Sequence, residues 1–278
     1  MTVRETAPAK VNLVLHVGPR RPDGLHELCS LFASLELADE LTIEPREHGD
    51  EDEIICPGVN GPNLATAALA AFRQAAGGDL PPLALTIDKR IPVAAGLGGG
   101  SADAAAALRA ANQLARRPLD RPTLHAIARE LGADVPSQLE PRHALVTGAG
   151  ENVEPVDLPN MVLVLAPAQQ GLSTKDVYAE ADRLPSTRAH VDPEALRRLT
   201  NVPLATLAKR MENDLQAAAL SLRPELATIL VQLEDAGALA TLVSGSGPTV
   251  VGVFAGEAEA AAATATLRHP IVTRLRHK

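Results

Sequence analysis

The chain has 278 residues, of which 46% are hydrophobic and 1% aromatic, and its formal net charge is −8 at pH 7. This length and apolar content predict a folded chain with one large or two ordinary domains, and they exclude an intrinsically disordered protein. An acidic chain with three Phe, one Tyr and no Trp lacks the basic surface and the stacking platforms of a nucleic-acid-binding protein, and its charge disfavours an anionic membrane as partner.

The cysteine content and the lengths of the apolar segments indicate the cellular compartment of the protein. Two cysteines, Cys29 and Cys56, are too few for a disulfide framework or a zinc site and are typical of reduced thiols in the cytoplasm. The N-terminus shows no basic segment followed by an apolar one, and no apolar run approaches the length of a membrane span. We therefore expect a cytoplasmic protein with no membrane partner.

The first half of the chain alternates between strand and helix signals. Asn63 suits a helix N-cap, Gly77 a helix end, and Gly132 the end of a later helix. The acidic run from Glu44 to Glu53 indicates a solvated loop. The expected elements are strands over 11–17, 28–44 and 83–88, a turn over 18–24, and helices over 63–78, 101–117 and 121–131.

The second half predicts a further sheet with helices. Strands are expected near 142–165, most clearly over 161–167, and helices over 173–236. Strands over 238–244 and 249–254, a helix over 256–268 and a strand over 270–275 complete the chain. Because no regular βαβ repeat appears, we expect an α+β fold, with an N-terminal domain over 1–157 and a C-terminal domain over 158–278.

A glycine-rich loop carries the strongest functional signal. Its sequence is Pro92-Val93-Ala94-Ala95-Gly96-Leu97-Gly98-Gly99-Gly100-Ser101. Such glycine density lets the backbone approach a ligand, and the helix start that follows offers unpaired N–H groups to an anion. The loop lacks the lysine of a P-loop and the last glycine of a Rossmann turn. It predicts a cradle for nucleotide phosphates in an ATP-dependent phosphotransferase, against the alternative of a flexible strand-to-helix turn.

Three other features are ambiguous on their own. Lys10 lies among apolar strand residues and is either a surface lysine or a point charge for phosphate. Asp134 follows a helix end and is either a helix cap or a general base. The segment from Ser244 to Thr249 is either a hairpin turn or a place where backbone approaches a ligand.

Together these motifs resemble the GHMP kinase superfamily, and more closely its family of 4-diphosphocytidyl-2-C-methyl-D-erythritol kinases. The matching segments run in order along nearly the whole chain: Pro8-Ala9-Lys10-Val11-Asn12-Leu13, Arg21-Pro22-Asp23-Gly24-Leu25-His26-Glu27, Ile87-Asp88-Lys89-Arg90-Ile91-Pro92, Gly98-Gly99-Gly100-Ser101-Ala102-Asp103-Ala104-Ala105, Gly132-Ala133-Asp134-Val135-Pro136, Asn213-Asp214-Leu215 and Ser244-Gly245-Ser246-Gly247-Pro248-Thr249. The resemblance implies an N-terminal domain like domain 2 of ribosomal protein S5 and a ferredoxin-like C-terminal domain. It also implies phosphorylation of the 2-hydroxyl of 4-diphosphocytidyl-2-C-methyl-D-erythritol by ATP, on the methylerythritol phosphate route to isopentenyl diphosphate.

The same resemblance implies a role for each matching residue. Asp134 would take the proton of the substrate hydroxyl, and Lys10 would stabilise the charge that develops. ATP would lie against Pro92, Val93, Ala94, Ala95, Gly96, Leu97, Gly98, Gly99, Gly100, Ser101 and Ala102, with Lys89 and Asn63 near its adenine and ribose. Ser101 would contact Mg²⁺. The cytidyl substrate would be bound by Asn12, Leu25, His26 and Tyr178, and the protein would act as a monomer or homodimer.

Two departures and three rival interpretations remain. Leu25 stands where the family usually has a tyrosine that stacks on cytosine, so Tyr178, the chain's single tyrosine, would supply the aromatic face. The segment Pro136-Ser137-Gln138 is smaller and more polar than is common in the family. The rivals are another GHMP enzyme such as homoserine or mevalonate kinase, a non-enzymatic binding protein on the same fold, and a nucleotide-dependent oxidoreductase. The joint presence of Lys10 and Asp134 argues against the binding protein.

Overall fold

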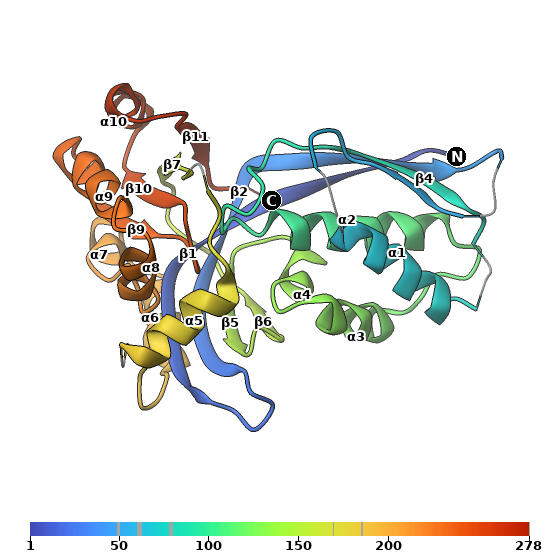
Figure 1. Ribbon diagram of the computed structural model, residues 1–278, viewed down its shortest axis with the longest axis horizontal. Helices are drawn as coiled ribbons and strands as arrows, with labels where there is room; N and C mark the ends of the chain where they lie inside the picture. The colour runs from blue at the N-terminus through green and yellow to red at the C-terminus, as the bar shows by residue number, and fades with distance from the viewer. Residues whose placement is uncertain (49–50, 60–62, 78–79, 169, 185, 278) are drawn as a thin grey trace. The chain divides into compact units, whose positions relative to one another are not determined.

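The computed structural model describes residues 1–48, 51–59, 63–77, 80–168, 170–184 and 186–277, and the chain divides into two compact units (Figure 1). Unit 1 comprises Met1–Ala9, Leu37–Val93 and Gly98–Pro141, and unit 2 comprises Lys10–Glu36, Ala94–Leu97 and Arg142–Lys278. The long strands β1 (Val3–Arg20) and β2 (His26–Pro45) contribute residues to both units. The units therefore interleave along the sequence, and the expected division after residue 157 stays a prediction.

Unit 1 combines strands with an alanine-rich helical layer. Strand β4 (Leu83–Asp88) pairs antiparallel with the end of β2 and parallel with β3 (Glu53–Ile55). Helices α1 (Leu64–Ala75) and α2 (Gly99–Leu114) lie along one face of these strands (Figure 1). Phe72 of α1 and Ile87 of β4 are fully buried in the shared core. The small side chains of α2 allow close packing, because its alanines 102, 104–107, 110 and 111 are buried.

Helix starts in unit 1 follow the capping signals of the sequence. Asn63 Oδ1 accepts the N–H of Ala65 at the start of α1, and Asp120 Oδ1 accepts that of Thr123 at the start of α3 (Arg121–Leu131). Gly132 follows the last residue of α3, and a short helix, α4 (Val135–Gln138), comes after it. The predicted cap at Asn63 and the predicted helix over 121–131 are confirmed.

Unit 2 contains two groups of strands. In the first, β1 pairs in parallel with β8 (Glu212–Asn213), and β2 pairs antiparallel with β5 (Ala144–Gly148), which pairs with β6 (Asn152–Pro155). In the second, four antiparallel strands lie in the order β11-β7-β10-β9. These four strands are β7 (Val162–Ala166), β9 (Ala240–Val243), β10 (Val250–Phe254) and β11 (Ile271–Arg274).

The helices of unit 2 fall between those strands. They are α5 (Thr174–Arg183), α6 (Pro193–Leu199), α7 (Leu204–Ala208), α8 (Gln216–Leu222), α9 (Leu226–Asp235), α10 (Glu257–Ala263) and the 3₁₀ turn Thr264–Thr266. Helix α9 packs on β9 and β10, and α10 packs on β7 and β10 (Figure 1). Helices thus separate β7 from β9 and β10 from β11, the β-α-β-β-α-β succession expected of a ferredoxin-like fold. Among the helices of the described ranges, none combines the length and apolar content that a membrane span requires.

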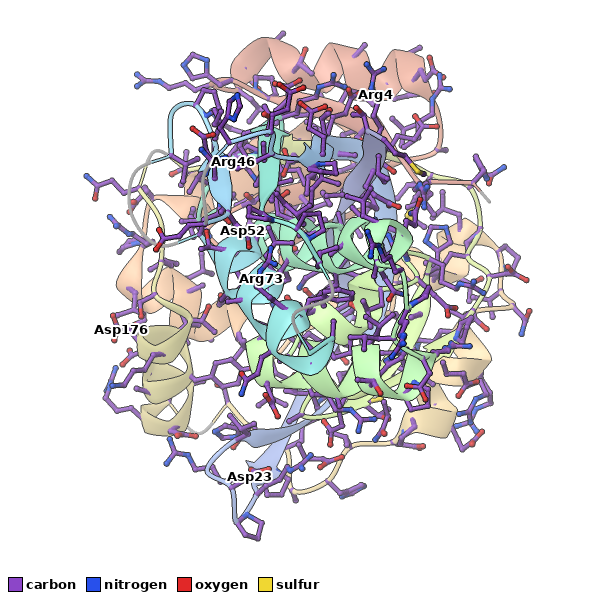
Figure 2. All side chains as sticks on the ribbon, turned by 90° about the vertical axis from the view of Figure 1, so that its right-hand side faces the viewer. Arg4, Asp23, Arg46, Asp52, Arg73 and Asp176 are labelled. Carbon is purple, nitrogen blue, oxygen red and sulfur yellow. The ribbon has the colours of Figure 1, made fainter. Side chains whose placement is uncertain are left out.

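Two expectations about local structure are wrong. Strand β1 spans Val3–Arg20 rather than 11–17. The expected strand was too short because Ala7 and Ala9, which are buried, are small residues without a clear strand preference. The acidic run from Glu44 to Glu53 is not simply a solvated loop, since Glu44 ends β2 and Glu53 starts β3; residues 49–50 lie outside the described ranges. Asp52 Oδ1 accepts hydrogen bonds from Arg73 at 2.5 Å and from the backbone N–H of Leu83 at 2.8 Å. Asp52 and Arg73 are labelled in Figure 2.

Candidate active site

Lys10 and Asn12 lie two residues apart on β1 in unit 2, so their side chains share one face of the strand. The Lys10 Nζ donates to Asn12 Oδ1 at 2.8 Å and lies 4.5 Å from the centroid of the Phe32 ring. Only 5% of Lys10 is exposed, which excludes the surface-lysine alternative. A buried ammonium needs polar partners, and these contacts hold it in a defined place.

The glycine turn between β9 and β10 packs against part of the glycine loop within unit 2. The backbone N–H of Thr249 donates to Ala95 O at 3.3 Å, and Ser244 Oγ donates to Gly96 O at 3.2 Å. A Cβ on Gly96 would lie 2.5 Å from Gly247 O, so this approach requires glycine. The turn is therefore a hairpin connection that packs against the glycine loop, and its approach to a ligand stays a prediction.

Lys10 joins the same assembly from β1. Its backbone N–H donates to Leu97 O at 2.9 Å. A Cβ on Gly245 would lie 3.2 Å from Asn12 Oδ1 and 3.8 Å from Lys10 Nζ. Three segments that are distant in sequence, around Lys10, Gly96 and Gly245, thus meet in unit 2.

Asn213 secures the glycine turn. Its Nδ2 donates to Val243 O at 2.8 Å and to Gly245 O at 2.7 Å, while its Oδ1 accepts the N–H of Leu215. With 7% of the residue exposed, all three interactions are shielded from water. The sequence motif that contains Asn213 therefore has a structural role in shaping the turn.

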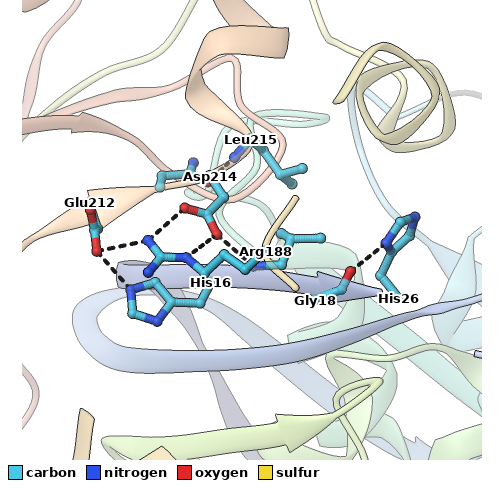
Figure 3. A network of polar contacts seen from close by, with 9 residues as sticks. His16, Gly18, His26, Arg188, Glu212, Asp214 and Leu215 are labelled. Carbon is cyan, nitrogen blue, oxygen red and sulfur yellow. Dashed lines mark hydrogen bonds and ion pairs between the residues drawn. The ribbon is translucent and has the colours of Figure 1, made fainter. Parts of the chain in front are cut away.

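An ionic network anchors β8, the strand that carries Asn213, beside β1, and Figure 3 shows this network around Glu212 and Asp214. Asp214 accepts hydrogen bonds from the Arg188 guanidinium and, at 2.9 Å, from the N–H of Val17. Glu212 accepts from Arg188 and lies 2.8 Å from His16 Nε2. Although partial burial acts to raise it, the hydrogen bonds from His16 and Arg188 lower the pKa of Glu212.

The remainder of the glycine loop leads into α2 in unit 1. The helix begins at Gly99 rather than at Ser101, so the expected loop is two residues too long. Ala94, Gly96 and Gly98 have positive φ angles of 53°, 75° and 71°, and alternating left-handed residues are the element of anion-binding backbone nests. Ala102 N–H donates to Gly98 O, so this group is satisfied within the helix.

Lys89 lies between two buried carboxylates of unit 1. Its Nζ donates to Asp39 Oδ2 at 2.5 Å and to Asp103 Oδ2 at 2.8 Å. Asp39 Oδ1 also accepts the N–H groups of Arg90 and Ile91, which fixes the backbone just before Pro92. The family resemblance implied that Lys89 lies near the adenine of ATP. In the structure its ammonium pairs with the carboxylates of Asp39 and Asp103.

This cluster holds two carboxylates against one ammonium. Asp39 is fully buried and Asp103 is 2% exposed. Burial raises the pKa of Asp103 to about 7, and the nearby charge of Asp39 acts in the same direction. The Oδ1 atom of Asp103 has no hydrogen-bond partner among the described residues, whereas both oxygens of Asp39 accept hydrogen bonds.

Asp134 belongs to unit 1 and precedes α4. It occupies the N-cap position, but its side chain makes no capping hydrogen bond, and Ser137 Oγ donates to its backbone O instead. Asp134 is half-buried. The interpretation as a helix cap is therefore wrong, and the general base stays a prediction. Ser101 is half-buried near the start of α2 in the same unit.

The residues expected at the cytosine gather in unit 2. The rings of His26 and Tyr178 have centroids 5.4 Å apart. His26 Nδ1 lies 2.9 Å from Gly18 O, and since a carbonyl only accepts, this nitrogen carries a proton. The His26 Nε2 lies 3.2 Å from Asp182 Oδ1, outside hydrogen-bond geometry. Leu25, next to His26, is 54% exposed.

Sequence reasoning missed several partners of the expected residues. Phe32 and Ser30 support the Lys10–Asn12 pair, Asp39 pairs with Lys89, and Asp182 lies beside His26. A signal existed for Ser30, since it is a polar residue in an otherwise apolar stretch of β2. For the acids, no local pattern indicated a partner.

The comparisons with known proteins show the family of the chain. Models of the GHMP kinases N terminal domain and the GHMP kinases C terminal match residues 63–140 and 194–271. A 4-diphosphocytidyl-2-C-methyl-D-erythritol kinase from Nocardia farcinica is 47% identical over 260 residues, which cover 87% of this chain and 82% of that protein. A crystal structure of 4-(cytidine 5′-diphospho)-2C-methyl-D-erythritol kinase has a TM-score of 0.81 and 35% identity, covering 99% of this chain and 100% of that one.

The comparisons also confirm the two-domain GHMP fold. The alignment with a homoserine kinase from Cytophaga hutchinsonii covers 99% of this chain and 94% of that one, with a TM-score of 0.73 and 18% identity. At this low identity the likeness shows the fold alone. In contrast, a sequence identity of 47% over most of the chain shows membership of a family and not only a shared fold. By that measure the chain belongs to the family of 4-diphosphocytidyl-2-C-methyl-D-erythritol kinases, within the GHMP kinases.

Proposed function

We propose that this chain uses ATP to phosphorylate the 2-hydroxyl group of 4-diphosphocytidyl-2-C-methyl-D-erythritol, a step of the methylerythritol phosphate route to isopentenyl diphosphate, in the cytoplasm. The observation that carries the proposal is the buried Lys10–Asn12 pair beside the glycine turn. Such a pair presents a fixed positive charge next to backbone that can approach a phosphate closely. We infer the substrate from the relatives, which are named as kinases of this compound.

Lys10 and Asp134 are the proposed catalytic residues. Phosphoryl transfer depends mainly on positioning and on neutralising charge as it develops. The Lys10 ammonium is suited to that because Asn12 and Phe32 restrict its movement, so little reorganisation is needed during transfer. Asp134, whose side chain does not cap α4, is the proposed acceptor of the hydroxyl proton.

ATP and Mg²⁺ are the proposed cosubstrate and metal. The loop from Pro92 to Ser101 and the start of α2 are the proposed phosphate site, with Lys89 and Asn63 toward the nucleoside. Mg²⁺, when bound, neutralises phosphate charge. No group of three or more His, Cys, Asp or Glu side chains in the described ranges could hold a metal. This donor set fits an ion bound mostly by phosphate oxygens and water, with the Ser101 hydroxyl as the protein ligand.

His26, Tyr178 and Leu25 are the proposed contacts for the cytosine. Tyr178 would offer an aromatic face and Leu25 an aliphatic one, while the protonated Nδ1 of His26 is held by Gly18 O. Because aromatic stacking on a base contributes about 1–3 kcal/mol, replacing the usual tyrosine by Leu25 is expected to weaken substrate binding without changing the reaction.

The test is a substrate-panel assay. Purified protein with ATP and Mg²⁺ is expected to release ADP with 4-diphosphocytidyl-2-C-methyl-D-erythritol, and ³¹P NMR is expected to show a new phosphate monoester. Asp134→Asn and Lys10→Ala are each expected to lower kcat by about 100-fold or more while the protein stays folded. Asp235→Asn, at the exposed end of α9, is the matched control and is expected to keep full activity.

Two results would contradict the proposal. ADP release with homoserine or mevalonate, but none with the cytidyl compound, would refute the substrate. Full activity of Asp134→Asn would refute the assignment of the base, even if the substrate proved correct.

A further inference from the structure

A chain of buried hydrogen bonds continues behind Lys10. Asn12 accepts from Lys10 Nζ through Oδ1 at 2.8 Å and donates from Nδ2 to Ser30 Oγ at 2.9 Å. Ser30 Oγ in turn donates to Val14 O at 2.6 Å. The exposed fractions of Lys10, Asn12 and Ser30 are 5%, 3% and 1%. Water therefore has little access to these groups, so each depends on the next.

The direction of every bond in this chain follows from its last member. The Val14 carbonyl can only accept, so the single proton of the Ser30 hydroxyl is used there. Ser30 Oγ can then only accept from Asn12, which must present its NH₂ group to Ser30. The opposite end of the amide, Oδ1, is thereby turned toward Lys10.

Strand β2 supports Lys10 by two routes on one face. Phe32 lies two residues after Ser30 and places its ring centroid 4.5 Å from Lys10 Nζ. Ser30 acts on Lys10 indirectly, through the side-chain amide of Asn12. Without the Ser30 hydroxyl, the Asn12 NH₂ group would lose its acceptor at a buried site, which is unfavourable. The amide would then be held only through its Oδ1 contact with Lys10, so it would restrict the ammonium less.

We propose that Ser30 is a positioning residue for phosphoryl transfer, which orients Asn12 and thereby holds the Lys10 ammonium in place. This inference rests on the role proposed for Lys10. Ser30 itself is 1% exposed, so it would act through Asn12 and not by touching ATP or the substrate. Its loss therefore affects the step in which Lys10 stabilises charge, and leaves the binding of ATP largely unchanged.

The test compares Ser30→Ala with Ser34→Ala. Ser34 lies four residues along β2, is 2% exposed, and its hydroxyl has no hydrogen-bond partner among the described residues. Ser30→Ala is expected to lower kcat about tenfold while the KM for ATP stays within about twofold; Ser34→Ala is expected to keep kcat. In the background of Asn12→Ala, the Ser30 substitution is expected to have no further effect on kcat.

A second measurement separates this inference from the proposed function. The side-chain amide protons of Asn12, assigned by their loss in Asn12→Asp, are expected to be protected from exchange with solvent in NMR spectra, and to lose that protection in Ser30→Ala. If Ser30→Ala does not fold, Ser30→Cys, a weaker donor of similar size, is expected to lower kcat relative to the unchanged protein, by less than about tenfold. An unchanged kcat, an equal loss in Ser34→Ala, or additive effects with Asn12→Ala would overturn the role of Ser30. A protected Asn12 amide in a protein with no transfer activity would instead refute the proposed function, and with it any role of Ser30 in transfer.

Discussion

Gly96 offers the sharpest test of the contact between the glycine loop and the glycine turn. Its φ angle is +75°, and a Cβ there would lie 2.5 Å from Gly247 O and 2.8 Å from Ser244 O. Both neighbours are backbone atoms, which cannot rotate away as a flexible side chain can. Gly96→Ala must therefore displace the turn.

The size of the effect follows from three contributions. A left-handed alanine costs about 1–2 kcal/mol. Reaching ordinary contact at 3.4 Å requires a shift of about 1 Å. That shift stretches the bonds from Thr249 N–H to Ala95 O and from Ser244 Oγ to Gly96 O, each worth about 1 kcal/mol. We expect a loss of unfolding free energy of about 3–4 kcal/mol, and a fall in kcat/KM of about 100-fold, since a displacement of about 1 Å can have that effect.

The assay measures unfolding in urea together with ATP-dependent ADP release. Gly237→Ala is the matched control in the same unit, because Gly237 has a φ of +86° and a Cβ there would meet no atom within 4 Å. It is expected to lose only about 1–2 kcal/mol and to keep its kcat/KM. Equal stability losses in the two variants, with kcat/KM unchanged in Gly96→Ala, would refute the close backbone approach.

Three further outcomes are expected. Asn213→Asp replaces the donor to Val243 O and Gly245 O by a carboxylate that repels both; urea unfolding should show a loss of about 3 kcal/mol, and no loss would contradict the clamp. The folded pKa of Asp103, raised by burial to about 7 against a usual 3.8, means that the unfolded chain releases this proton first, so stability falls as pH rises from about 4 to about 7. Asp103→Asn should remove that fall in pH-dependent unfolding curves, and an unchanged slope would refute it. Tyr178→Ala should raise KM for the cytidyl substrate about tenfold and leave that for ATP unchanged, whereas an equal rise in both would refute stacking.

The sequence predicted those features that depend on neighbouring residues. The cap at Asn63 and the strand over Leu83–Asp88 were recognisable because a capping side chain acts within three residues and a strand shows its own alternation. Side-chain pairings across the fold could not be predicted in this way. Ser30 meets Asn12 across 18 residues, and Lys89 meets Asp39 across 50. Nothing in the local pattern of either residue specifies its partner, because strand pairing creates the contact.

The structure also separates glycines that the sequence treated as one signal. Gly96 is required by the backbone of Gly247, and a Cβ on Gly99 would lie 3.1 Å from the Ile91 side chain. Position 96 needs glycine whether or not a nucleotide binds, whereas an alanine at position 99 would require the Ile91 side chain to shift by a few tenths of an ångström. Gly100 differs, because a Cβ there would meet no described atom within 4 Å, and alanine would favour the helix by about 1 kcal/mol. The proposed approach of phosphate to backbone thus depends most directly on Gly100, in the first turn of α2, and the density of glycine around it reflects the folding of the chain.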